Sequence, residues 1–100
     1  MARIWLDDVR PAPEGFIWCQ SVNKAKFMIT MLEGMSSPIE LIDCDHDMGD
    51  FASKGGDGMK LLDWLIERNT LYPVRIHSMN GAAAERMRQT IKRYWSIKDQ

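Results

Sequence analysis

The sequence has little cysteine, no strong charge of one sign and no long hydrophobic run. Only two of its 100 residues are cysteines, Cys19 and Cys44, and their spacing matches neither a metal-binding pair nor a redox pair. The 13 basic and 14 acidic residues nearly cancel, so composition gives no reason to expect binding of nucleic acid or an anionic membrane over the whole surface. The chain turns acidic too soon for a signal peptide, and no apolar run is long enough to span a membrane. We therefore expect a cytoplasmic protein whose two thiols are reduced and buried.

Repeats, low-complexity tracts and linkers are absent as well. A chain of 100 residues with 45% hydrophobic content can form one core, but it is too short for two domains of ordinary size. We expect a single domain that covers residues 1–100.

The most informative stretch is residues 38–50, where an apolar run turns abruptly acidic. Its first half is typical of a buried parallel strand, and its second half holds four aspartates and a histidine within eight residues. Crowded carboxylates repel one another unless a cation neutralises them. The stretch therefore predicts a divalent-metal site at the end of a central strand.

Apolar periodicity divides the rest of the chain into short strands and amphipathic helices. Besides the strand that opens residues 38–50, we predict strands at residues 3–6, 16–20 and 74–76, and helices at 22–33, 58–68 and from residue 81 onward. Side chains suited to cap the three helices at their N-termini are Ser21, Asp57 and Asn80, and Gly34 is suited to end the first helix.

Two loops lie among these elements. Two prolines exclude a regular element over residues 10–15. Residues 51–56 are polar and contain two glycines, and we predict that they form a mobile flap beside the acidic stretch. Within this flap, Lys54 is either solvated or turned toward the site.

The alternation of strands and helices predicts an α/β fold. We expect a flavodoxin-like three-layer sandwich with a short, four-stranded, mainly parallel sheet in the order 2-1-3-4. In this order the carboxyl ends of the first and third strands are neighbours, and ligands bind outside them. Asp7 and Asp8 would then lie beside Asp45 and Asp47, flanked by residues 77–78.

Three segments of the sequence resemble a known family. They are WLDDxRPxPxG at residues 5–15, DHDMG at residues 45–49 and HSMN at residues 77–80, and together they look like the cyclic-phosphate-processing branch of the response-regulator receiver superfamily. The resemblance implies a receiver-like fold without the fifth strand and its helix, and a role in processing cyclic phosphates of nucleotides or RNA ends. It places Asp45 at the phospho-accepting aspartate, Asp7 and Asp8 at the metal-binding acids, and Ser78 near the signalling hydroxyl.

The chain also departs from ordinary receivers. Gly49 stands where receivers usually have proline, Gly81 stands where the narrower family is expected to have proline, and the histidines His46 and His77 are additional. The essential lysine would lie on the fifth strand, which should begin where this sequence ends. Without that lysine we do not expect an aspartyl-phosphate switch.

Acidic residues at the predicted sheet edge are candidate metal ligands. Mg²⁺ or Mn²⁺ would take oxygen ligands from Asp7, Asp8 and Asp45, with Asp47 as a fourth candidate. The alternative is that these carboxylates are solvated or cap helices, and that Asp47 bonds to loop amides. Asp43, one step back along the strand, fits a structural hydrogen bond or a role in the site equally well.

Other side chains could bind or cleave a phosphate. Candidate catalytic residues are Asp45, His46 and His77, because two imidazoles at one rim can supply a general acid and a general base. Their alternative is a structural hydrogen bond. Candidate phosphate-binding residues are Arg10, Ser78 and Asn80, although Arg10 could instead pair with a neighbouring acid.

Two functions fit these residues. The first is divalent-metal-dependent processing of cyclic phosphates, with a phosphate-containing small molecule or an RNA end as the ligand. The second is a non-catalytic module that binds a phosphorylated ligand or a protein partner. The four tryptophans are predicted to be mostly in the core, although one exposed near the rim could stack on a base.

Overall fold

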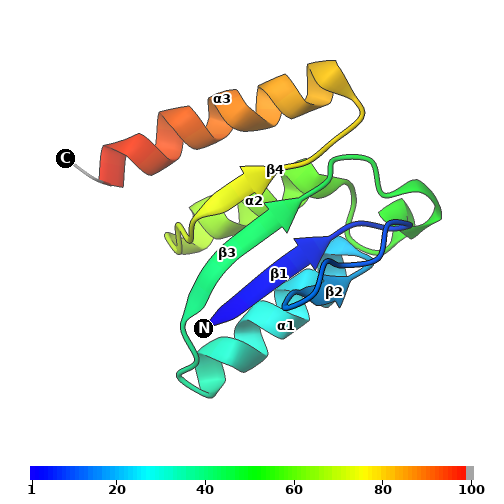
Figure 1. Cartoon of the computed structure of the whole chain (residues 1–100). Helices are drawn as coiled ribbons and strands as arrows, with labels where there is room; N and C mark the ends of the chain where they lie inside the picture. Colours follow the sequence, from blue (N-terminus) through cyan, green and yellow to red (C-terminus); the bar gives the residue numbers. More distant parts are fainter. Residues whose placement is uncertain (99–100) are drawn as a thin grey trace.

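The sheet has the predicted strand order. The computed structural model describes residues 1–98. It contains strands β1 (Ala2–Leu6), β2 (Ile17–Cys19), β3 (Ile39–Cys44) and β4 (Val74–Ile76), all parallel and arranged β2-β1-β3-β4 (Figure 1). β1 and β3 therefore form the centre of the sheet, and their carboxyl ends lie side by side.

Two helices and a short 3-10 helix connect strands, and a third helix follows β4. They are α1 (Val22–Gly34), η1 (Gly49–Ser53), α2 (Gly58–Arg68) and α3 (Gly81–Lys98). Two predicted caps are confirmed, because Ser21 Oγ accepts from the backbone N of Lys24 at 3.1 Å and Asn80 Oδ1 accepts from that of Ala83 at 3.2 Å.

Two other predicted helix signals work differently. The Asp57 carboxylate makes no cap to α2, because it accepts instead from the backbone N of Met48 at 3.0 Å and so holds the loop that follows β3. Gly34 is the last residue of α1, but the left-handed residue after this helix is Ser36, with φ of 55°. The predicted flap begins inside η1, and the carbonyl of Lys54 accepts from the backbone N of Asn23 at 3.0 Å.

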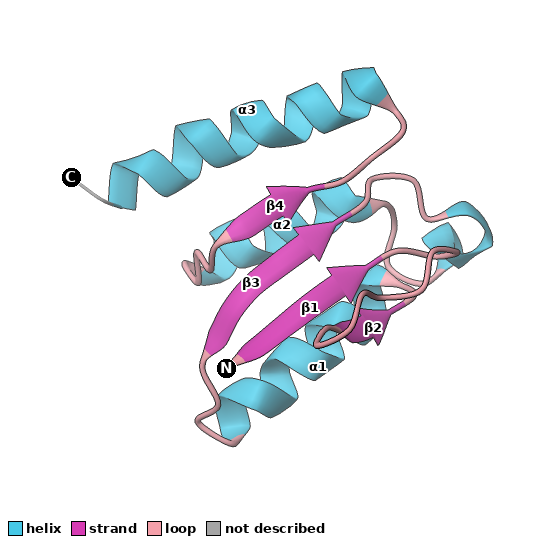
Figure 2. Ribbon diagram, viewed as in Figure 1, coloured by secondary structure: helices cyan, strands magenta, loops and turns pink. Residues whose placement is uncertain are grey.

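The helices all pack on one face of the sheet. Ile4 and Leu6 are paired in register with Ile42 and Cys44, and these buried side chains meet the apolar faces of the helices. Figure 2 shows α1 and α2 behind the sheet, and the buried Met87 brings α3 to the same core. A sandwich with helices on both faces is therefore not what the described residues form.

The opposite face lacks a helix because β1 joins β2 through a loop that contains two prolines. The Trp5 side chain lies on this face, in register with Asp43. Its Nε1 donates to the carbonyl of Arg10 at 2.9 Å, and its ring makes an edge-on contact with Phe16. The loop thus covers part of the face that a helix would cover in a three-layer sandwich.

Both cysteines are buried and unpaired, as predicted. Burial raises the pKa of the Cys19 thiol to about 11 and raises that of Cys44 as well, so neither is a reactive thiolate. Among the described residues, no helix combines the length and the apolar character needed to cross a membrane.

Candidate functional site

The carboxyl ends of β1, β3 and β4 bring together three titratable side chains from distant parts of the chain. Asp7 follows β1, Asp45 follows β3, and the backbone N of Asp45 donates to the carbonyl of Leu6 at 2.9 Å. One potential ligand atom from each of Asp7, Asp45 and His77 lies within 4.8 Å of the other two. The strand order explains this meeting, because it makes the carboxyl ends of β1, β3 and β4 successive neighbours.

Asp7 is fully buried and its carboxylate oxygens are fully used. Oδ1 accepts from the backbone N of Val9 at 3.0 Å and from that of Arg10 at 2.8 Å. Oδ2 meets Arg10 Nε at 3.2 Å and His77 Nε2 at 3.0 Å. Burial disfavours the charge, but these four contacts outweigh it and lower the pKa of Asp7. Asp7 is therefore an anion held in a fixed position.

His77 bridges two buried carboxylates. Its Nδ1 lies 2.6 Å from Asp43 Oδ1, and its Nε2 faces Asp7 on the other side. Burial opposes protonation of the ring, but the two carboxylates outweigh burial and raise the pKa of His77. The ring also stacks on Trp5, with centroids 3.7 Å apart and planes within 7°. His77 therefore acts as a clamped imidazolium between Asp7 and Asp43.

Asp43 has a structural role that the sequence did not distinguish from a role in the site. Besides His77, it binds Arg75, whose Nε and Nη2 lie 2.8 and 2.7 Å from Oδ2. Burial opposes ionisation of Asp43, yet His77 and Arg75 together lower its pKa. The sequence did carry a signal for this pair. When the apolar positions of β3 and β4 are aligned, Asp43 lies opposite Arg75, which is the observed register.

Asp45 is the buried carboxylate with the least compensation. It is 8% exposed, and its Oδ1 accepts from the backbone N of His46 at 2.8 Å. The Ser78 hydroxyl also bonds to it, but it forms no ion pair with any described cation. Burial and then the nearby charge of Asp7 raise the pKa of Asp45. A cation would therefore be stabilised most strongly beside this side chain.

An open pocket of about 270 Å³ adjoins these buried groups. Three of its lining residues are acids, Asp8, Asp45 and Asp47, and one is basic, Arg10. The remaining lining residues are Val9, Gly49, Ser78, Met79 and Asn80. The predicted phosphate-binding residues and three of the four predicted metal ligands thus share one pocket.

Gly49 lets Asp8 lie on the pocket wall. Its backbone has φ of +52°, which proline cannot adopt and other residues adopt only with strain. A Cβ at this position would lie 2.6 Å from Asp8 Oδ2. The backbone therefore favours the glycine that distinguishes this chain from ordinary receivers, and any side chain here would push the Asp8 carboxylate away from its present position.

The remaining predicted residues lie at the rim. His46 Nδ1 is 2.5 Å from Asp47 Oδ1, and Asn80 Nδ2 lies 3.4 Å from both carboxylate oxygens of Asp47. His46 and then Asn80 lower the pKa of Asp47, outweighing a small effect of burial. Asp47 is thus held by side chains, not by loop amides. Neither His46 nor His77 is a lining residue of the pocket.

Among the described residues, Asp7, Asp45 and His77 are the one group of three possible metal ligands whose ligand atoms lie within 4.8 Å of one another, and Asp45 also faces the pocket. A cation among Asp7, Asp45 and His77 would displace the proton on His77 Nε2 and the bonds already made to Asp7. On the pocket side, the Asp8 side chain makes no hydrogen bond or ion pair to a described residue, and Asp45 forms no direct ion pair with one, although the nearby charge of His77 favours its ionised form. Carboxylate oxygens facing an open pocket are typical of Mg²⁺ and Mn²⁺ sites.

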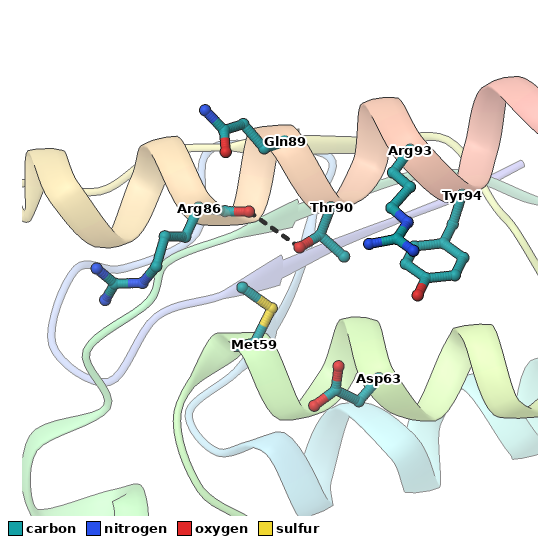
Figure 3. A pocket seen from close by; sticks show the side chains of 7 residues that line it. All are labelled: Met59, Asp63, Arg86, Gln89, Thr90, Arg93 and Tyr94. Carbon is teal, nitrogen blue, oxygen red and sulfur yellow. Dashed lines mark hydrogen bonds between the residues drawn. The ribbon is translucent and has the colours of Figure 1, made fainter.

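A larger pocket of about 440 Å³ lies elsewhere, between α2 and α3. Figure 3 shows Met59 and Asp63 projecting from α2 toward Thr90 and Tyr94 of α3. It is also lined by Arg86, Gln89 and Arg93. It contains one acid and no histidine, so it does not offer the cluster of groups found at the strand ends.

A parallel sheet in the order 2-1-3-4, with acidic side chains after its two central strands, defines a receiver-like α/β domain. Comparison with protein families then specifies the branch. The profile of the cyclic-phosphate processing receiver domain matches residues 2–93, and the chain belongs to this family. The resemblance noted in the sequence is thereby confirmed. No curated protein and no solved structure matches the chain.

Proposed function

We propose that the 270 Å³ pocket binds a cyclic phosphate and that the protein hydrolyses it to a phosphate monoester with the help of Mg²⁺ or Mn²⁺. The observation that carries this proposal is that three acids and Arg10 line one pocket, next to the buried Asp7 and the half-buried His77. The acids attract a cation, and a cation and an arginine together can neutralise a phosphate.

Asp8 and Asp45 would hold the cation, with Asp47 as a third oxygen ligand. When bound, the cation supplies positive charge to the phosphate oxygens and to the charge that builds up in the transition state. Asp7 lies behind these ligands and fixes the loop that carries Arg10, through its bonds to that residue's backbone and side chain. Asp7 thus positions Arg10 toward the phosphate.

Arg10 and Ser78 would bind the phosphate directly. Only the Nε of Arg10 is bonded to Asp7, and its two terminal nitrogens make no hydrogen bond to a described residue. A guanidinium with two free nitrogens can bind two phosphate oxygens at once. Asn80 lines the same wall while it caps α3 and holds Asp47.

Ring opening adds water across one P–O bond, so a base must take a proton from water and an acid must give one to the leaving oxygen. His46 lies between two lining residues, Asp45 and Asp47, and is the nearer candidate for one of these transfers. His77 lies behind the wall, and we assign it the positioning of Asp7 and Asp43.

The test is phosphorus NMR of adenosine 2′,3′-cyclic phosphate incubated with the protein, with and without Mn²⁺. We expect metal-dependent conversion to a monoester that Asp45→Asn abolishes and that His46→Gln slows by on the order of 10²-fold. Arg86→Gln, in the pocket between α2 and α3, is the control and should convert the substrate normally. Conversion that persists in Asp45→Asn would refute the assignment of this pocket.

A second function, binding without catalysis, is favoured by one specific observation. Both histidines are bonded to carboxylates, and neither lines the pocket. If the protein is a binding module for a phosphorylated ligand or a protein partner, the same experiment will show a Mn²⁺-dependent shift of the ligand signal without conversion.

A further inference from the structure

A third pocket, of about 230 Å³, lies beside the acidic one and has the opposite character. Its lining residues come from β2 and the residues after it, the start of α1, η1 and the residue that follows η1. Two aromatic and two basic side chains line it, Trp18, Phe51, Lys24 and Lys54, together with Gln20 and Ser21. It contains no acid. Such a combination of flat rings and cations suits an aromatic ligand that carries negative charge.

The two pockets share a wall. Gln20 Nε2, in the aromatic pocket, donates to the backbone carbonyl of Asp8, in the acidic pocket, at 3.1 Å. Gly49 lines the acidic pocket and Phe51 lines the aromatic one, and both belong to η1. The two pockets are therefore neighbours, linked through Gln20 and Asp8 on one side and through η1 on the other.

The groups that line the aromatic pocket are available to a ligand. Trp18 is 38% exposed, and its ring is fixed because Nε1 donates to the carbonyl of Asp7 at 2.7 Å. The Lys54 ammonium makes no ion pair with a described residue. The Lys24 ammonium lies 5.7 Å from the ring centre of Phe27, without a carboxylate partner among the described side chains. Both lysines can thus turn to a phosphate at little cost.

We infer that the aromatic pocket binds the base and the 5′-phosphate of the nucleotide whose 2′,3′-cyclic phosphate occupies the acidic pocket. The base stacks on Trp18 and Phe51, and Lys24 and Lys54 neutralise the 5′-phosphate. The substrate class is then a nucleotide with phosphate on both sides of its ribose, as at an RNA end. This inference rests on the proposed function for its cyclic-phosphate half only.

The test compares three ligands by isothermal titration with Mn²⁺ present: adenosine 2′,3′-cyclic phosphate, the same molecule with a 5′-phosphate, and adenosine 5′-monophosphate. His46→Gln protein is used so that turnover does not consume the ligands. We expect the 5′-phosphate to tighten binding of the cyclic nucleotide severalfold. Lys54→Gln and Lys24→Gln should remove that gain and leave binding of the ligand without 5′-phosphate unchanged. Arg86→Gln should keep the gain.

Trp18 is tested with a pair of substitutions. Trp18→Leu should weaken the binding of all three ligands roughly tenfold, because it removes the stacking surface. Trp18→Phe keeps a ring but loses the bond to Asp7, so it should retain most of the affinity. Equal weakening by both variants would show that Trp18 acts through Asp7, and it would overturn the stacking role. If Trp18→Leu fails to fold, the Lys54→Gln comparison decides alone, because Lys54 makes no side-chain contact that folding needs.

The outcomes separate this inference from the proposed function. If cyclic phosphates are hydrolysed but the lysine variants keep the gain from the 5′-phosphate, the aromatic pocket is not a subsite and the proposed function stands. The opposite outcome is that adenosine 5′-monophosphate binds, that Trp18→Leu and Lys54→Gln weaken its binding, and that cyclic phosphates are neither bound nor opened. In that case the aromatic pocket is a nucleotide subsite and the proposed function is wrong.

Discussion

At the scale of single residues, one protonated imidazole compensates two buried negative charges. Asp43 and Asp7 each have a second cationic partner, Arg75 and Arg10, but these arginines are substantially exposed and His77 is not. The strongest interaction is therefore expected from the ring, because a less solvated charge is less screened.

Replacing this ring with an apolar side chain should destabilise the fold. We expect His77→Leu to lower the free energy of unfolding by about 3–5 kcal/mol, because it leaves two buried carboxylates with part of their charge uncompensated. Urea unfolding at pH 7 measures the change. His46→Leu is the control, since its partner Asp47 is mostly exposed, and it should cost about 1 kcal/mol or less. Equal unfolding midpoints for the two variants would contradict the bridging role of His77.

Gly49 allows a second residue-scale prediction with a matched control. Gly49→Ala should cost about 1 kcal/mol through its positive φ and, by displacing the Asp8 carboxylate, weaken Mn²⁺ binding about tenfold. Gly15 also has a positive φ, of 87°, but a Cβ there would meet nothing within 4 Å. Gly15→Ala should therefore lose stability and keep its Mn²⁺ affinity, as measured by titration calorimetry. Unchanged affinity in Gly49→Ala would separate Asp8 from the metal site.

At the scale of elements, an ion pair ties the end of α1 to the end of α2. Arg68 donates from both terminal nitrogens to Glu33, at 2.6 and 3.3 Å, and the Tyr72 hydroxyl bonds to the same carboxylate. The hydrogen bond from Arg68 lowers the pKa of Glu33 by more than burial raises it. Burial, and then Glu33, raise the pKa of Tyr72 to about 12. This contact fixes how the two helices and the segment before β4 meet.

This contact should make stability depend on pH. Because the folded state lowers the pKa of Glu33 below its usual value of about 4.5, the stabilisation is fully present above that pH and is lost as pH falls through the lowered value. We expect Glu33→Gln to be about 1 kcal/mol less stable than the unmodified chain at pH 7. The difference should shrink steadily below pH 4.5. Urea unfolding at several pH values measures it, and a difference that stays constant down to pH 3 would contradict the assignment.

At the scale of the whole molecule, a bound cation should stabilise the entire fold. Its proposed ligands follow two different strands, so binding is possible only when the sheet is formed. Mn²⁺ at 100 times its dissociation constant should raise the free energy of unfolding by about 2.7 kcal/mol. Thermal unfolding with and without Mn²⁺ measures this effect, and Asp45→Asn should remove it. Stabilisation that survives in Asp45→Asn would place the cation elsewhere.

Much of this architecture could be predicted from the chain, because it depends on local pattern. Apolar periodicity and cap residues predicted the strands and helices, their alternation predicted a flavodoxin-like strand order, and that order brings Asp7 near Asp45. The bridge from Asp43 through His77 to Asp7 could not be read in the same way. It depends on which face of each strand a side chain occupies and on how far a ring lies from two carboxylates.

The predicted second layer of helices failed for a similar reason. Residues 10–15 form a loop, as predicted, and this loop takes the place of a helix between β1 and β2. A connection from β1 to β2 without a helix leaves one face without a helical cover, and every later crossover runs the other way along the sheet. The number of helical layers on the sheet therefore depends on the single connection between β1 and β2.

The bond between Asp7 and His77 joins positions 70 residues apart in the chain. Closing so long a loop costs chain entropy, and this cost comes before the contact contributes any stabilising free energy. We therefore expect the site to form late in folding. During synthesis, Asp7 and Asp43 emerge well before their shared counter-ion. Until β4 is added, Asp43 lacks both of its cationic partners, Arg75 and His77, whereas Asp7 already has Arg10 beside it, so burial of Asp43 at low cost awaits that strand.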